Sequence, residues 1–132
     1  MTSLHIDTTL FILLYMSMAF DWIYQTAEEG LGKFDNWRIR ARHAFKYSAL
    51  TYVLISLFGY CTWWGLCIWL TLFGTHFMID DRKAVKWLMK KVKMIGDREM
   101  DSLWWMQIKI DQWLHMIVNF LLAVVSYYVM AV

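Results

Sequence analysis

Histidines and acidic residues recur at four-residue spacing in a sequence that is otherwise rich in apolar residues. Residues four apart on a helix share one face, so each set presents its side chains together. Imidazole and carboxylate are ligands of zinc, manganese and non-haem iron, and a bound cation would offset the burial of several negative charges. The sets are Asp21 and Gln25; His43 alone; His76, Asp80 and Lys83; and Asp111, His115 and Asn119.

The composition indicates that these residues belong to a membrane protein. The chain has 132 residues, of which 60% are hydrophobic, and it has no proline, whereas an ordinary soluble domain is about 45–50% apolar. Runs without a charged residue extend over positions 8–20, 47–79 and 116–132. One domain is the limit at this length, so residues 1–132 are expected to form a single membrane domain.

The charge-free runs predict an all-α fold, a bundle of four transmembrane helices. A helix that crosses the membrane needs about 17–25 residues, because it must span about 30 Å at 1.5 Å per residue. A tight hairpin is expected inside the longest run, where Gly59, Gly65 and several aromatic residues interrupt it. The spans are predicted at about residues 8–25, 43–58, 62–80 and 102–130.

The basic residues predict the orientation of this bundle. All thirteen lie between Lys33 and Lys109, and most of them fall in the segments that join spans one and two and spans three and four. By the positive-inside rule both segments are cytoplasmic, which places both termini on the other side.

The segment between spans three and four also predicts an amphipathic helix. Its lysines alternate at helical spacing with apolar residues, which is typical of a helix that lies on an anionic leaflet. Packing of the same helix against a partner subunit is the alternative. The lysines of the basic face are Lys83, Lys86, Lys90 and Lys93.

This topology brings the polar sets to one depth, near the cytoplasmic boundary of the hydrocarbon. Ionisable residues in such a place normally face the bundle and pair, so they form a functional-site hypothesis. Asp21 is expected to act as a base or as a further ligand, and Lys83 to stabilise an oxyanion or bind phosphate. The metal ligands are expected to be His43, His76, Asp80, Asp111 and His115, oriented by Gln25, Gln112 and Asn119.

Four segments, "AFDWIYQT", "RHAFKY", "HFMIDDRK" and "IDQWLHMI", resemble an integral-membrane family of bacteria and phages that is catalogued only as a domain of unknown function. The resemblance runs from about residue 10 to residue 125 and implies a bacterial inner-membrane protein, but no activity. Ser17 departs from it, since the family typically has a histidine there. Carried over, the motifs select Asp21, Gln25, Lys33, His43, His76, Asp80, Lys83, Asp111, Gln112 and His115.

The leading hypothesis is a metal-dependent hydrolase in the membrane that acts on a lipid-linked or amphipathic substrate, with zinc, manganese or iron as the ion. One alternative is an oligomeric channel, transporter or metal carrier. Another is a structural or host-interaction protein, in which Asp21 or Asp80 pairs with Lys83 or Arg42 only to hold the bundle together. A haem between two histidines is a fourth. A homo-oligomer is possible, no nucleic-acid partner is expected, and the sequence leaves open whether the protein is an enzyme.

Overall fold

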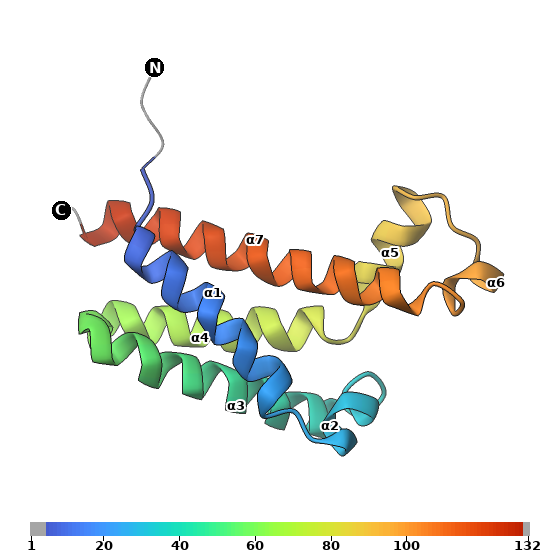
Figure 1. Ribbon diagram of the computed structural model, residues 1–132, viewed down its shortest axis with the longest axis horizontal. Coiled ribbons are helices and arrows are strands. Elements are labelled where there is room, and N and C mark those ends of the chain that lie inside the picture. Colours follow the sequence, from blue (N-terminus) through green and yellow to red (C-terminus); the bar gives the residue numbers. More distant parts are fainter. Residues whose placement is uncertain (1–4, 131–132) are drawn as a thin grey trace.

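The computed structural model describes residues 5–130, which form seven α-helices and one π-helical turn. The predicted all-α class is confirmed. Four long helices run side by side in alternating directions, so α1 begins and α7 ends at the same end of the bundle (Figure 1). The elements are α1 (Thr8–Ile23), α2 (Ala27–Gly32), α3 (Trp37–Ile55), η1 (Ser56–Tyr60), α4 (Trp63–Ile79), α5 (Lys83–Lys91), α6 (Asp97–Met100) and α7 (Trp104–Met130).

The long helices lie where the four spans were predicted, but their lengths differ. By length and composition α7, with 27 residues, is long and apolar enough to cross a membrane, whereas α1 and α4 are apolar but have 16 and 17 residues. Helix α3 begins at Trp37, six residues before the predicted position 43, because the side chain of Asn36 accepts a hydrogen bond from the backbone N–H of Arg38 and caps it.

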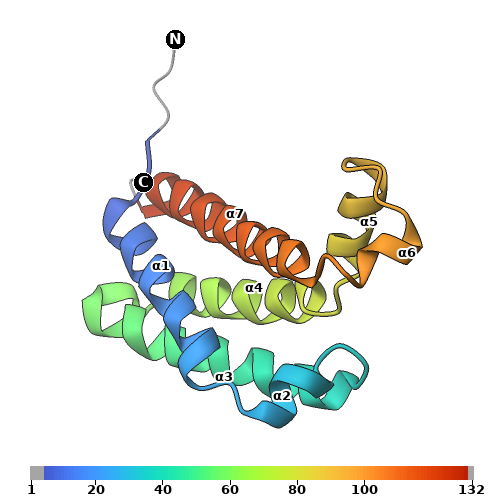
Figure 2. The same ribbon diagram turned by 45° about the vertical axis from the view of Figure 1, so that its right-hand side comes forward.

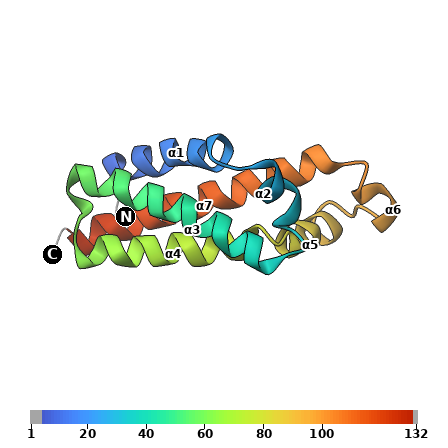
Figure 3. The ribbon, with the colours of Figure 1, turned by 90° about the horizontal axis from the view of Figure 1, so that it is seen from below.

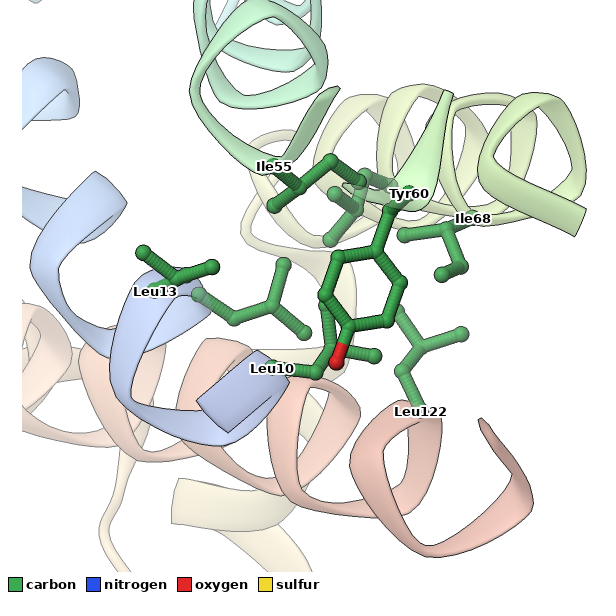
Figure 4. Packing of buried hydrophobic residues seen from close by; sticks show 8 residues of the cluster. Leu10, Leu13, Ile55, Tyr60, Ile68 and Leu122 are labelled. Carbon is green, nitrogen blue, oxygen red and sulfur yellow. The ribbon is translucent and has the colours of Figure 1, made fainter. Parts of the chain in front are cut away.

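The four long helices enclose an apolar core at the end of the bundle where α1 begins. Helices α1 and α4 each pack against both α3 and α7, and the turned view shows α1 lying between α3 and α7 (Figure 2). The ring of Tyr60 sits among leucine and isoleucine side chains of this core (Figure 4). The buried members are Leu10, Leu13, Leu14, Ile55, Tyr60, Ile68, Leu72 and Leu122.

The predicted hairpin between the second and third helices is confirmed, and two glycines make it possible. Gly59 has a φ of 94°, a conformation that residues with a Cβ rarely adopt. A Cβ on Gly65 would lie 1.8 Å from the carbonyl oxygen of Tyr60. Only a glycine allows the turn and the start of α4 to approach this closely.

Helix α5 lies beside the beginning of α7, at the end of the bundle where α2 and α6 also gather (Figure 3). Val85 and Met89 are buried and pack with Met100 and residues of α7. The lysines of the basic face are exposed, as predicted. Part of the apolar face of α5 therefore packs on α7 of the same chain. Trp87 of α5 stays exposed.

Helix α2 is held against α3 by the buried carboxylate of Glu29, which is 1% exposed. Lys46 Nζ lies 2.8 Å from Glu29 Oε2, and the backbone N–H of Thr26 donates to the same oxygen at 3.1 Å. Burial alone would raise the pKa of Glu29, but the hydrogen bonds from Lys46 and Thr26 outweigh it and hold this pKa below its ordinary value of 4.5. The ionised carboxylate thus fixes the short helix that ends at Gly32, directly before Lys33.

We expect Glu29→Gln to lower the free energy of unfolding by about 1–3 kcal/mol at pH 7, because hydrogen bonds to a charged acceptor are lost. A depressed pKa stabilises the fold above the ordinary value and loses that contribution as the pH falls, so the difference from wild type should shrink below pH 4.5. Thermal denaturation in detergent at several pH values measures both effects. Glu28→Gln, at a largely exposed neighbour, is the control and should change little; equal losses in the two variants would contradict the assignment.

Candidate metal centre

Six buried polar side chains from different helices converge near the end of the bundle that carries α2. We call them the polar cluster. Each is at most 7% exposed, although all six are ionisable groups that water would solvate better than an apolar core does. The members are Asp21 on α1, Lys33 after α2, His43 on α3, His76 on α4, Asp80 after α4 and His115 on α7.

His43 lies at the centre of the polar cluster and points its Nε2 atom at three other potential ligands. This nitrogen is 2.7 Å from Asp21 Oδ1. It is also 3.2 Å from His76 Nε2 and 3.4 Å from Asp80 Oδ2. Four potential ligand atoms from three long helices and the end of α4 therefore face one point.

His76 completes this arrangement, since its Nε2 atom lies 3.2 Å from Asp80 Oδ2 and 3.5 Å from Asp21 Oδ1. Ligand atoms that surround a tetrahedral zinc ion at about 2.0–2.1 Å are about 3.3–3.4 Å apart. Four of the five separations around His43 and His76, 3.2 to 3.5 Å, are close to that value. The geometry suits a small divalent ion with nitrogen and oxygen ligands.

His115 presents a further ligand atom to the same place. Its Nδ1 lies 2.9 Å from the backbone carbonyl of Asp111. A carbonyl can only accept, so Nδ1 carries the proton and Nε2 keeps a free lone pair, as in many metal-binding histidines. Asp21, His43 and His76 form one possible ligand group, and His76, Asp80 and His115 form another.

Two ligand atoms of the polar cluster have no hydrogen-bond partner among the residues described. The buried Nδ1 atom of His76 has none either, and the two ligand atoms are His115 Nε2 and Asp80 Oδ2. Buried polar atoms are nearly always paired, and an unpaired one costs about 1–3 kcal/mol. A cation coordinated by these atoms would satisfy both.

Lys33 supplies a positive charge to the polar cluster. Its Nζ atom lies 3.2 Å from Asp80 Oδ1 and 3.4 Å from His43 Nε2, and the residue is 6% exposed. Residue chemistry alone does not single out Lys33, because it follows a short helix without periodic pattern; only the family resemblance points to it. The lysine and a metal ion are the two possible counter-charges for the aspartates.

Tyr47 is a residue that the sequence analysis missed. Its ring stacks on His76 with centroids 4.3 Å apart and fixes the plane of that imidazole. Tyr47 follows His43 by four residues, so the same-face rule that joined the other sets could have found it. Ser17, which departs from the family pattern, lies 3.5 Å from the Tyr47 hydroxyl and donates to the carbonyl of Leu14.

Several predicted residues lie outside the polar cluster. Lys83 is 86% exposed and pairs with Asp81, so the structure does not bring it to Asp21 or Asp80. Arg42 contacts Glu28 and Glu29 rather than Asp21 or Asp80. Asn119 is buried one helical turn after His115, where its side-chain amide donates to the carbonyl of Leu14 and joins α7 to α1.

Asp111, Gln25 and Gln112 face a cleft beside the polar cluster. The cleft has a volume of about 170 Å³, and Asp21 and Lys33 also line it, so it meets the polar cluster directly. The carboxylate of Asp111 is 14% exposed and lies 3.9 Å from His115 Nδ1, too far for a hydrogen bond. Asp111 thus reaches the cluster through its backbone carbonyl, while its side chain belongs to the cleft.

Comparisons with protein-family models, with curated proteins and with solved structures gave no match. The resemblance to the membrane family of unknown function therefore stays a prediction. The geometry of the polar cluster carries the functional inference.

We expect Lys33→Met to lower the free energy of unfolding by about 3–5 kcal/mol in protein freed of metal by a chelator, because Asp80 loses its buried partner. Lys83→Met removes an exposed lysine and should change it by less than about 0.5 kcal/mol. Thermal denaturation in detergent compares the two variants. A larger loss in Lys83→Met would show that the wrong lysine has been assigned to the aspartates.

Proposed function

We propose that this protein is a four-span membrane protein that binds a divalent metal ion in the polar cluster and hydrolyses an amphipathic substrate there. The observation that carries the proposal is the convergence of three imidazoles and two carboxylates, two of whose buried ligand atoms have no hydrogen-bond partner among residues 5–130. Each part of the proposal has its own support.

The apolar side chains on the exposed surface support a location in the membrane. Large apolar side chains are exposed along all four long helices, which is unusual for the surface of a soluble protein. Tryptophan favours the boundary between water and hydrocarbon. Seven of the nine are exposed: Trp22, Trp37, Trp63, Trp87, Trp104, Trp105 and Trp113.

The donor set supports zinc, manganese or iron as the ion. Imidazole and carboxylate together bind these metals, whereas an all-oxygen site would favour magnesium or calcium. Asp21, His43 and His76 form one group of three ligands and His76, Asp80 and His115 form the other, so an ion held by either group would keep a position for water. Tyr47 and the Asp111 carbonyl hold two of the imidazoles in position.

The cleft supports hydrolysis. A bound divalent ion lowers the pKa of a water ligand to about 7 and so supplies a nucleophile at neutral pH. Asp21 faces both the polar cluster and the cleft, where it can accept a proton. Lys33 lines the cleft and can stabilise negative charge that develops on the substrate, the role that the sequence predicted for Lys83.

Conduction through a single chain is disfavoured by the apolar core. Leu10, Leu14 and Leu122 belong to the apolar core that fills the bundle on the other side of the polar cluster from α2. The buried hydroxyls of Ser17 and Thr51 donate to carbonyls of their own helices and form no continuous path. A conducting route needs polar groups through the full thickness.

Elemental analysis of the purified protein after loading with zinc, manganese or iron should give about one ion per chain. His76→Ala and the more conservative His115→Gln should each lose most of it, because each removes a ligand. His5→Ala is the control, since His5 stacks on Tyr127 at the other end of the bundle. Circular dichroism establishes that each variant is folded.

The same experiment separates the metal site from a purely structural network. If the ion binds the aspartates, zinc should restore stability to Lys33→Met, by about 4 kcal/mol at a thousandfold excess over the dissociation constant. Wild-type protein that takes up no ion, together with a Lys33→Met variant that zinc does not rescue, would contradict the metal site and favour the network.

The proposed orientation places α2, α5 and α6 in the cytoplasm and the α3–α4 hairpin on the opposite side. Cys61 is exposed in this hairpin, so in a Cys67→Ser background a membrane-impermeant maleimide should label it on intact bacterial cells. A cysteine introduced as Lys90→Cys, with Cys61 and Cys67 replaced by serine, should react only after permeabilisation. The reverse pattern would invert the topology.

A further inference from the structure

We propose that the cleft and the groove beside it bind a lipid phosphate, with the phosphate held between Lys33 and Arg82 and the hydrocarbon tail lying between α1 and α7. This inference rests on the proposed function and names the substrate class of the same site. Five observations carry it: the shape of the two hollows, a guanidinium without a carboxylate partner among residues 5–130, the strained backbone of that arginine, the charge balance and the apolar lining.

The two hollows adjoin, because they share two lining residues, and they differ in polarity. The cleft of about 170 Å³ has room for about five water molecules at about 30 Å³ each, enough for a phosphate group. A groove of about 440 Å³ runs beside it along α1 and α7. Trp22 and Gln112 line both, so a molecule with a polar head and an apolar tail can occupy the two together.

Arg82 is a partly buried cation without a carboxylate partner among residues 5–130. Its guanidinium stacks on Phe34, 3.5 Å from the ring centroid, and contacts the neutral side chain of Gln107 at 3.4 Å. An anion in the cleft would stabilise this charged side chain.

The backbone of Arg82 is also strained. Its φ of 59° lies in the left-handed region, which is uncommon for residues other than glycine, asparagine and aspartate. Such strain persists where the surrounding structure enforces it, and it often marks a ligand site. The turn places the arginine side chain on Phe34, on the wall of the cleft.

The charge balance makes the cleft selective for an anion once the metal is bound. With a divalent ion, Lys33 and Arg82, the positive charges exceed the negative charges by at least one unit, even when all three aspartates are ionised. The three carboxylates belong to Asp21, Asp80 and Asp111.

The groove is suited to a hydrocarbon chain. Met16, Met18 and Met116 line it together with Tyr15 and Ala19, and methionine adapts to flexible apolar ligands. Met16 is 58% exposed and Tyr15 is 55% exposed, so the groove opens outward along α1. In the proposed membrane orientation a tail could enter it sideways from the lipid.

The test compares two single-chain lipids, palmitoyl glycerol phosphate and palmitoyl glycerol, which differ only in the phosphate. Both are titrated into zinc-loaded full-length protein in a nonionic detergent, and binding is measured by native mass spectrometry. We expect the phosphate lipid to bind at least about tenfold more tightly, because one charge-assisted hydrogen bond contributes about that factor. Inorganic phosphate alone should bind more weakly than the lipid, since it does not fill the groove.

Two variants separate head from tail. Arg82→Asn should cost about tenfold in affinity for the phosphate lipid while the fold is retained, since asparagine tolerates the left-handed backbone. Ala19→Phe should fill the groove and weaken binding of both lipids. The controls are Arg98→Asn, at an exposed position of α6, and Ala84→Phe, in a different apolar groove along α4 and α5; neither should change binding.

The outcomes distinguish this inference from the metal site. Zinc-loaded protein that binds the two lipids equally, prefers a cationic amphiphile, or keeps its affinity in Arg82→Asn would overturn the lipid-phosphate site while the metal site stands. Protein that takes up no metal yet binds the phosphate lipid through Arg82 would support this site and contradict the proposed function.

Discussion

Burial of charge in an apolar bundle is the constraint on which the structure depends. Asp21 and Asp80 are buried among histidines, and neither can remain ionised there without a nearby cation. Lys33 is that cation, and it follows a short helix that is itself held in place by the buried Glu29. The position of α2, which looks peripheral in the ribbon, therefore follows from the electrostatics of the core (Figure 1).

The sequence predicted the helices and the convergence well, because both depend on local pattern. Charge-free runs and four-residue spacings placed His43, His76 and His115 on helices that meet. Long-range packing was harder to predict. Lys83 shares a stripe with His76 and Asp80 in the sequence, but the helix ends at Ile79 and the left-handed Arg82 turns the chain away, so Lys83 reaches solvent.

Residue spacing did not identify the two cations of the site, because neither belongs to a periodic pattern. Lys33 follows a six-residue helix, and Arg82 occupies a turn, so neither belongs to an amphipathic pattern that sequence analysis could read. Asn119 shows the opposite case, since its spacing matched the site but its amide serves helix packing. Spacing identifies which side chains share a face, whereas turns decide which faces meet.

The uneven placement of positive charge has a consequence for biosynthesis. Every lysine and arginine lies between Lys33 and Lys109, at the end of the bundle that carries α2, α5 and α6. The α3–α4 hairpin has no ionised side chain from Tyr47 to Ile79 when His76 is neutral. In the proposed orientation the nascent chain can insert as two helical hairpins without translocating a basic residue, so the arrangement that builds the site also permits its assembly.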